Sequence, residues 1–385
     1  MIPFHCPQIR LPDLFTVPFI RDGQEQLSKK LSEYFSTENV VLLRSARYGI
    51  RKALNTLSIT EGSEVIIPAL ICDSVVDAVR EAGARPVFCD IEEQGSNMDP
   101  AACRELVNEK TVAIIVAHLF GFPARIDEYT SMAREKDLVL IEDCAHAFGG
   151  KVGGQLLGTF GDFGVFSFGI SKNITATGGG LLICRDANAR QSISESISVE
   201  GVSGGWRKLL MAGGSKMVFN RHLYRFFRAR VAKFGEGGKA QDFNVFEGTM
   251  PEIDAGLVLP QLERFEEIRT RRNANAKLLL TGLEGSAHTF DIALDEGSSS
   301  LFFPIRGDGS GMRRKQFLEH GLEVNVLGYG EPYRDEKNRD CIRSSCPNME
   351  RIMDRYLLLP LGHDKGTTGK YLALIGDPKL RGEGS

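Results

Sequence analysis

Short apolar runs alternate with helical patterns along residues 41–184. The apolar runs are rich in β-branched residues, and they predict strands at Val40–Leu43, Glu64–Pro68, Pro86–Asp90, Thr111–Ala117, Leu138–Glu142, Phe163–Phe168 and Gly180–Cys184. Apolar residues at helical spacing predict intervening helices at Ala46–Leu57, Asp73–Ala82 and Asp127–Lys136. Continuous apolar strands separated by helices are buried on both faces, so we predict an α/β fold with a large, mostly parallel sheet.

The pattern changes after this region. Residues 191–245 include three glycine-containing stretches that we expect to be flexible, and this part is predicted to be irregular and insertion-like. A long helical pattern begins at Pro251, and the rest of the chain alternates strand and helix patterns at Leu301–Ile305, Gly311–His320 and Tyr356–Leu359. We therefore predict a large α/β domain over residues 1–250. A linking helix and a small C-terminal α+β domain would occupy residues 251–385.

The ends of the predicted strands indicate where a ligand would bind. In parallel sheets, ligands gather at the carboxyl ends of the strands. This rule places several chemically useful side chains near one rim: Ser45, Pro68, His118, Asp143 and Ser167.

Composition and charge exclude several classes of protein. The 385 residues contain 47 Lys and Arg against 50 Asp and Glu, so no overall basic field favours nucleic acid. No apolar run reaches the roughly 18 residues that span a bilayer, and the N-terminus lacks a signal-peptide pattern. The eight cysteines form no CxxC pair, so we expect no metal site, no structural disulfide and a reducing, cytoplasmic location.

Lys172 is a candidate nucleophile. It lies between the apolar run Phe163–Phe168 and the three glycines at 178–180. A lysine on a short turn at a sheet rim can be partly desolvated, which lowers its pKa and makes its amine nucleophilic. The alternative is an ordinary solvated surface lysine.

Asp143 and His146 form a second candidate group. Asp143 ends a buried apolar run, where a carboxylate is costly unless a cation such as a protonated pyridine nitrogen faces it. His146 follows three residues later, so one helical turn would bring it near the same pocket. The alternatives are a helix N-cap for Asp143 and a simply packed ring for His146.

The segment Ser45-Ala46-Arg47 opens the first helix after the first strand. Free N–H groups and the helix dipole make such a position an anion site, to which Ser167 could add a hydroxyl. Capping alone would also explain Ser45. Neither a Walker A motif nor a GxGxxG fingerprint follows the first strand, so this is not a common nucleotide-binding loop.

The order of these motifs resembles the DegT/DnrJ/EryC1/StrS family of fold-type-I pyridoxal 5′-phosphate (PLP) enzymes, which are mostly nucleotide-sugar aminotransferases. The resemblance covers residues 30–185 well and continues in parts of the C-terminal half. It rests on SARYGIRKAL, GSEVIIPAL, GARPVFCDI, VAHLFG, IEDCAHAFGG, GDFGVFSF, SKN and GGG.

The resemblance implies a role for each motif residue. Lys172 matches the lysine that binds PLP covalently, and Asp143 matches the partner of the pyridine nitrogen. His146 stands where the family usually has a glutamine near the ring hydroxyl of the cofactor. Ser167 and the segment Ser45-Ala46-Arg47 match the phosphate site.

The resemblance also implies an activity. A dehydratase branch of the family has histidine in place of the lysine, so Lys172 favours transamination. We therefore expect a cytoplasmic homodimer that moves an amino group, with glutamate as donor, to a nucleotide-linked keto-sugar. Two alternatives are a non-catalytic PLP-binding or regulatory protein of the same fold, and a PLP-dependent sugar dehydratase or lyase.

Three positions depart from the family pattern. Ser45-Ala46-Arg47 replaces a small-Gly-Thr sequence, which alters the phosphate site. Cys72 occupies the place of the aromatic residue that stacks on the cofactor. Glu247 stands near the place of an asparagine that reaches the phosphate of the neighbouring subunit, where a carboxylate would be repulsive unless balanced.

The basic segment 219–234 contains five basic residues, no acidic one, and aromatics at helical spacing. Three interpretations remain open. It could be an amphipathic helix packed on the dimer, which we prefer, or a basic wall facing the diphosphate of a sugar nucleotide. Attachment to an anionic membrane surface is the least favoured.

Overall fold

The predicted α/β fold is confirmed. The computed structural model describes residues 1–197, 205–226, 247–284, 286, 290–292, 294–306, 310–325, 331–335, 338, 341–353 and 356–376. Each strand predicted between residues 40 and 184 is present, with its ends shifted by a residue at most.

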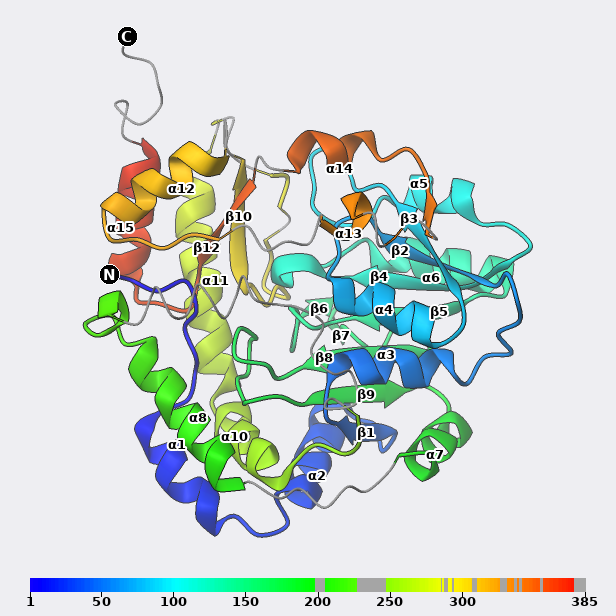
Figure 1. Ribbon diagram of the computed structural model, residues 1–385, viewed down its shortest axis with the longest axis horizontal. Helices are drawn as coiled ribbons and strands as arrows, with labels where there is room; N and C mark the ends of the chain where they lie inside the picture. The colour runs from blue at the N-terminus through cyan, green and yellow to red at the C-terminus, as the bar shows by residue number, and fades with distance from the viewer. Residues whose placement is uncertain are drawn as a thin grey trace.

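A large sheet of eight strands forms the centre of the described chain (Figure 1). Within this sheet β9 alone runs against the others, because both of its pairings are antiparallel. In spatial order the strands are β1 (Val40–Leu43), β9 (Gly180–Cys184), β8 (Phe163–Ser167), β5 (Val139–Asp143), β4 (Thr111–Ala117), β2 (Glu64–Pro68), β3 (Arg85–Cys89) and β11 (Ile342–Arg343).

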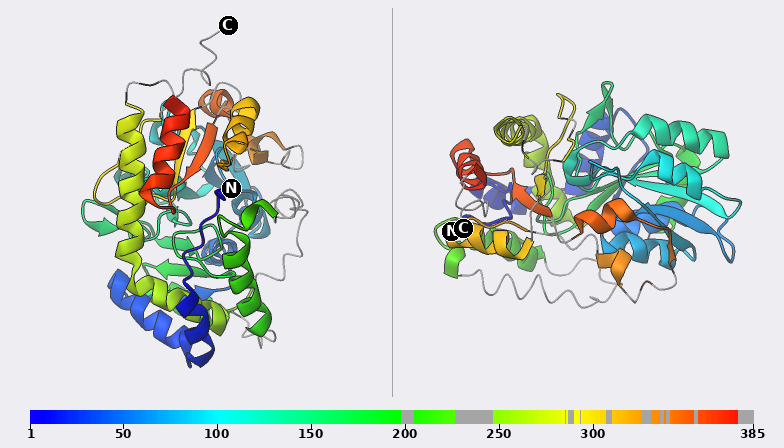
Figure 2. Two further views of the ribbon diagram at one scale, coloured as in Figure 1. Left: turned by 90° about the vertical axis from the view of Figure 1, so that its left-hand side faces the viewer. Right: turned by 90° about the horizontal axis from the view of Figure 1, so that it is seen from above.

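Alternate residues of each strand supply two hydrophobic cores, one on each face of the sheet. Val41 and Leu43 of β1 belong to one core, and Val40 and Leu42 belong to the other. This two-sided burial explains why the strands are continuously apolar. Helices cover both faces (Figure 2): α2 (Gly23–Phe35), α3 (Ala46–Leu54), α4 (Asp73–Glu81), α5 (Pro100–Leu106), α6 (Ile126–Lys136), α7 (Ala187–Glu195) and α10 (Glu252–Glu263).

The C-terminal part contains a second, two-stranded sheet in which β10 (Phe302–Arg306) pairs antiparallel with β12 (Tyr356–Pro360). Helices α11 (Phe265–Gly282) and α12 (Ser310–Glu319) pack on this small sheet, and α15 (Lys365–Gly376) packs on α11. Helices α13 (Glu331–Arg334) and α14 (Pro347–Ile352) instead lie beside the large sheet, since α13 contacts α4 and the first turn of α14 donates backbone hydrogen bonds to Asp90, the residue after β3. The short strand β11 belongs to this part of the sequence but pairs with β3 at the edge of the large sheet. The division at residue 250 stays a prediction.

Within the region 191–245, the described residues 205–218 are more regular than predicted, and the other two glycine-containing stretches lie mostly or wholly outside the described residues. Helix α8 (Gly205–Val218) includes the sequence MAGGSK, which we expected to be flexible. Two glycines in a helix cost roughly 1 kcal/mol each relative to alanine, and packing offsets this, because Ala212 is buried where α8 meets α1 (Leu11–Thr16) and α10. Of the predicted basic segment, residues 219–226 are described and 227–234 lie outside the described residues.

Candidate active site

A cavity of about 350 Å³ lies at the carboxyl ends of the parallel strands. All eight residues predicted from the sequence line it: Ser45, Ala46, Arg47, Cys72, Asp143, His146, Ser167 and Lys172. The other lining residues are Ile50, Ile71, Ser74, Val75, Ala117, His118, Leu119 and Ala145. Pro68, which we also expected at this rim, is not among the described lining residues.

Lys172 lies on a tight turn after β8, where its backbone N–H bonds the carbonyl of Gly169 at 3.0 Å. The next residues are held to distant parts of the chain, since the Asn173 side chain donates to the carbonyl of Ser299 and the backbone N–H of Thr175 donates to Gln261 Oε1. Burial lowers the pKa of Lys172, although the charges of Cys72 and Asp143 oppose the shift. The turn is therefore anchored on both sides, and the amine is easier to deprotonate than in water.

Asp143 ends β5 and faces the same cavity. Its Oδ1 accepts a hydrogen bond from the backbone of Ala145 at 3.0 Å. Burial raises the pKa of Asp143, and this effect exceeds the opposing contributions of the Ala145 N–H, Lys172 and His118. A desolvated carboxylate of this kind gains free energy when a cation binds beside it.

His146 is a neutral ring with a defined tautomer. Its Nδ1 accepts a hydrogen bond from the backbone N–H of Phe120 at 3.3 Å, so in the neutral ring the proton is on Nε2. The ring also stacks on Phe120 at a centroid distance of 6.1 Å. Burial and the charge of Lys172 hold the pKa of His146 well below 6.5. At neutral pH His146 can therefore donate one hydrogen bond from Nε2.

The N-terminus of α3 forms another wall of the cavity. Ser45 caps this helix by accepting a hydrogen bond from Tyr48 N at 3.2 Å, as expected for an N-cap. Strand β9 approaches closely at Gly180, where an added Cβ would lie 2.6 Å from Ala46 N. Ala46 and Arg47, the first two residues of α3 after Ser45, offer backbone N–H groups at the positive end of the helix dipole.

Arg47 lines the cavity, but its guanidinium is bound to acids on α4. It pairs with Glu81 and lies 3.9 Å from Asp77. Arg51, one helical turn further, pairs with Glu81 at 3.3 Å and with Glu247 at 2.8 Å. The resemblance placed the carboxylate of Glu247 near the phosphate of a neighbouring subunit, and Arg51 balances its charge.

Cys72 is exposed at the N-terminus of α4, and Ser74 Oγ lies 3.3 Å from its sulfur. Phe, Tyr and Trp are absent from the described residues that line the cavity. A flat ligand in the cavity would therefore contact a thiol and aliphatic groups at the wall formed by Cys72, in place of an aromatic ring.

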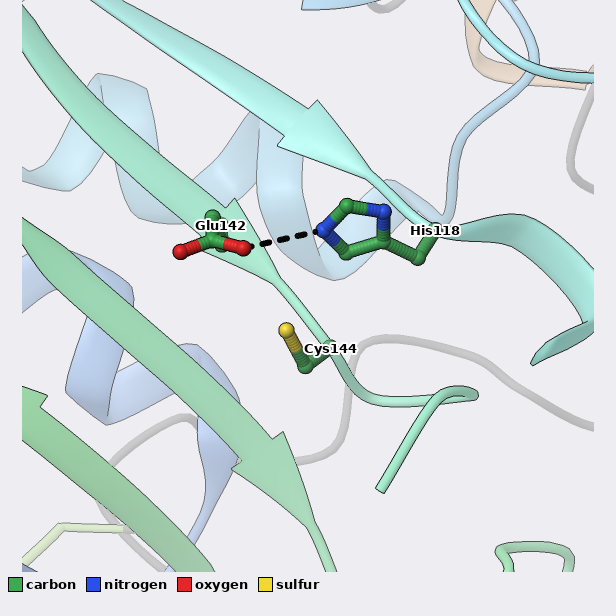
Figure 3. A group of neighbouring side chains, drawn as sticks. All are labelled: His118, Glu142 and Cys144. Carbon is green, nitrogen blue, oxygen red and sulfur yellow. Dashed lines mark hydrogen bonds and ion pairs between the residues drawn. The ribbon is translucent and has the colours of Figure 1, made fainter. Parts of the chain in front are cut away.

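Directly beside the cavity, His118, Glu142 and Cys144 form a buried cluster (Figure 3). His118 Nε2 contacts Glu142 Oε2 at 3.2 Å, and His118 Nδ1 accepts a hydrogen bond from Ala124 N. Glu142 also accepts three backbone hydrogen bonds at 2.8 Å, from Gly158, Phe160 and Gly161.

This cluster has the ligand types of a metal site but not the free ligand atoms. Both nitrogens of His118 and both oxygens of Glu142 are already bonded within the protein. Burial raises the pKa of the Cys144 thiol far above 9, so it is not a thiolate. The cluster is therefore better explained as a hydrogen-bonded support for the turn at 158–161.

Sequence reasoning missed the role of His118 and the proximity of His5. The Nδ1 atom of His5 lies 2.8 Å from Ser171 Oγ, next to Lys172, although His5 is far away in the sequence. Burial and the charge of Lys172 lower the pKa of His5 to about 4. A lone histidine near the N-terminus carries no sequence signal that could have placed it here.

The DegT/DnrJ/EryC1/StrS aminotransferase family profile matches residues 20–369. Two curated relatives are GDP-perosamine synthase of Escherichia coli O157:H7, 34% identical over 42% of this chain, and L-glutamine:2-deoxy-scyllo-inosose aminotransferase of Micromonospora echinospora, 31% identical over 68%. The aligned parts cover 44% and 57% of the lengths of these relatives.

Solved structures share the fold over nearly the whole chain. The aminotransferase TlmJ from Streptoalloteichus hindustanus has a TM-score of 0.77 and 21% identity, with 97% of this chain and 98% of that one covered. A GDP-4-keto-6-deoxymannose-3-dehydratase with a trapped PLP-glutamate geminal diamine has a TM-score of 0.78 and 17% identity, with 97% and 100% covered. At these identities the likeness concerns the fold alone.

Proposed function

The chain belongs to the DegT/DnrJ/EryC1/StrS aminotransferase family, and we propose that it is a PLP-dependent aminotransferase. The proposed reaction moves an amino group from glutamate to a nucleotide-linked keto-sugar. The observation that carries the proposal is the convergence of Lys172 and Asp143 on one cavity, at the ends of β8 and β5. The relative named GDP-perosamine synthase supports a nucleotide-sugar substrate, and glutamate is the donor that the family resemblance implies.

The residues that line the cavity fit PLP. The volume of the cavity lies in the range of small-molecule sites. Its groups include an amine of lowered pKa, a desolvated carboxylate, a neutral imidazole donor and a helix N-terminus. PLP carries an aldehyde, a basic ring nitrogen, a ring hydroxyl and a phosphate, so each group has a chemical counterpart.

When bound, PLP supplies an electron-accepting ring that stabilises negative charge on the substrate carbon. Lys172 would hold the cofactor covalently and, once released, would take a proton from the α-carbon of the amino donor through Nζ. Its lowered pKa keeps more of the amine in the neutral form that this step requires.

Asp143 would hold a proton on the ring nitrogen, because its desolvated carboxylate is stabilised by a cation. His146 would donate Nε2–H to the ring oxygen, in place of the glutamine usual in the family. The N–H groups of Ala46 and Arg47, with Ser45 and Ser167, would bind the phosphate. Since the Arg47 guanidinium is occupied by Glu81, Arg47 would contribute through its backbone.

We further propose a cytoplasmic homodimer. The eight cysteines are free, which suits a reducing compartment. The pairing of Glu247 with Arg51 removes the repulsion that would otherwise oppose a phosphate from a neighbouring subunit.

A half-reaction separates this proposal from its alternatives. The PLP-loaded protein would be converted to its pyridoxamine form with glutamate, and keto-sugar nucleotides would then be screened for return of the aldehyde absorbance. Conversion by glutamate and return by at least one keto-sugar nucleotide are expected. Good PLP binding with no conversion by any donor would favour a non-catalytic protein, and a dehydrated product without consumption of donor would favour a dehydratase or lyase.

A further inference from the structure

Large exposed apolar side chains are concentrated on one surface. Among the residues whose side-chain exposure the structure describes, each large exposed apolar residue lies on α1, on the following turn η1 (Val17–Phe19), or between residues 210 and 226. They are Leu11, Phe15, Phe19, Leu210, Met211, Met217, Leu223 and Phe226. Single exposed apolar residues are ordinary, but a group of this size marks an interaction surface.

The elements that carry these residues are neighbours in space. Helices α1 and α8 contact each other, and α1, η1 and α8 all pack on α10. Both helices lie at the lower left of Figure 1, and the left view of Figure 2 again places them near each other. We call the eight side chains together the α1–α8 surface. Leu11, Phe15 and Phe19 are four residues apart, and Phe15 and Phe19 are 73% and 84% exposed.

The part of the α1–α8 surface formed by residues 205–226 is attached to the rest of the protein through its inward-facing side chains. Ala212 is buried, and the ring of Tyr224 is buried with its hydroxyl donating to Glu323 at 2.6 Å. Phe219 stacks on Tyr224 and contacts His5 edge-on. Because these contacts fix the inner side, Leu210, Met217 and Phe226 cannot simply turn inward to leave water.

The charge of this segment is positive throughout. Residues 205–226, which the structure describes, contain five Lys and Arg residues and no Asp or Glu, whereas the whole chain has a net charge of −3. Within the described residues, Arg221 and Arg225 accompany the exposed apolar side chains, and Arg221 lies 4.0 Å from the exposed carboxylate of Asp364. The acid of α1, Asp13, is buried and paired with Arg264, so it adds no negative charge to the surface.

From this combination we propose that the α1–α8 surface binds the surface of an anionic membrane. Aromatic and aliphatic side chains that enter the interface beside an acid-free basic segment are the features of interfacial binding. A second copy of the chain fits less well, since a two-fold contact would bring the same basic segment against itself. Among the described residues no helix has the length and hydropathy to cross a bilayer, so the contact would be peripheral.

Vesicle flotation of the PLP-loaded protein tests the proposal. We expect binding to phosphatidylcholine vesicles containing about one third phosphatidylglycerol, little binding to pure phosphatidylcholine, and a loss of binding at high salt. The double substitution Phe15→Ser with Phe19→Ser should weaken vesicle binding roughly tenfold or more, because these rings lose their contact with the lipid. Both positions are exposed, so circular dichroism and turnover should stay unchanged.

A charge-matched pair of variants provides the control. Arg221→Gln with Arg225→Gln should weaken binding roughly tenfold, because each basic residue contributes near an anionic surface. Arg104→Gln with Arg134→Gln removes the same charge from α5 and α6 and should leave binding unchanged.

Several results would overturn the proposal: no flotation with anionic vesicles, equal flotation with both compositions, or no effect of the Phe15 and Phe19 substitutions. A change of oligomeric state in the Phe15 and Phe19 variant, without vesicle binding by the wild type, would instead identify the surface as a subunit contact. Turnover is measured separately, so failure here leaves the proposed reaction untouched.

Discussion

Two adjacent carboxylates at the end of β5 lie in regions of opposite character. Glu142 is held below the cavity by three backbone N–H groups and His118, and it is completely buried. Asp143 faces the cavity and accepts a hydrogen bond from the backbone N–H of Ala145. Because a strand places successive side chains on opposite faces, one residue step separates a structural acid from an acid available to a ligand.

The difference shows how a site can be both rigid and reactive. The region around Glu142 satisfies its polar atoms within the protein and fixes the ends of β4 and β5. The region around Asp143 and Lys172 leaves polar groups desolvated. Burial raises the pKa of Asp143 and lowers the pKa of Lys172, so the neutral form of each group is favoured. Stability and reactivity should therefore respond to different substitutions.

The substitution Lys172→Ala should have the largest effect, on the reactive region alone. Loss of the amine should lower turnover by roughly 10³-fold or more, because both covalent attachment and proton transfer are removed. Single-turnover kinetics would measure the effect, with the exposed Lys151→Ala as control. An active Lys172→Ala protein would remove this residue from the mechanism.

The substitution Glu142→Gln should act on the structural region. A neutral amide accepts weaker hydrogen bonds and presents an NH₂ group to a backbone donor, so we expect a loss of about 3 kcal/mol in the free energy of unfolding. Urea titration of the cofactor-free protein would measure it. A stability equal to that of the wild type would mean that this network does not support the fold.

The substitution Asp143→Asn, one residue further, should lower turnover rather than stability. Asparagine can still accept the Ala145 N–H, but it cannot hold a proton on a ring nitrogen, so turnover should fall roughly 10²-fold. The stability of the cofactor-free protein should not fall.

The pH dependence of that variant follows from the direction of the pKa shift. The pKa of Asp143 is raised above 3.8, so the folded state binds this proton more tightly than the unfolded state, and stability is lost as the pH rises through the raised value. The Asn variant lacks this loss. Its Tm advantage over the wild type should be larger at neutral pH than at about pH 4, and an advantage that grew on acidification would contradict the assignment.

The smallest expected effect concerns the wall of the cavity. Cys72→Phe restores an aromatic residue at the family position, and a stacked ring should contribute about 1 kcal/mol, or roughly a fivefold lower Kd for PLP. Equilibrium dialysis would measure the Kd, with Cys72→Leu as a matched apolar control. Equal affinities for the two variants would show that stacking is not available at this position.

Much of the fold was predictable because it is encoded locally. Runs such as Val40–Leu43 and Thr111–Ala117 are continuously apolar and β-branched, and the structure has strands at these same residues. The cavity followed from the rule that sites lie at strand ends, so Asp143, Ser167 and Lys172 could be placed together before the structure was known.

The remaining features depend on contacts between distant segments. The pairing of Arg47 with Glu81 and of Arg51 with Glu247 cannot be read from either residue alone. The helical form of α8 depends on packing against α1 and α10, which overrides the preference of Gly213 and Gly214. Likewise β11 is only two residues long and forms because β3 offers an open edge.

The central claim is that Lys172 is the residue that binds the cofactor covalently. Borohydride reduction of the PLP-loaded protein, followed by peptide mass mapping, tests this directly. The account predicts a stable PLP adduct on Lys172, and no adduct in the Lys172→Ala protein. An adduct on another lysine of the wild type, or bound PLP with no adduct at all, would contradict it.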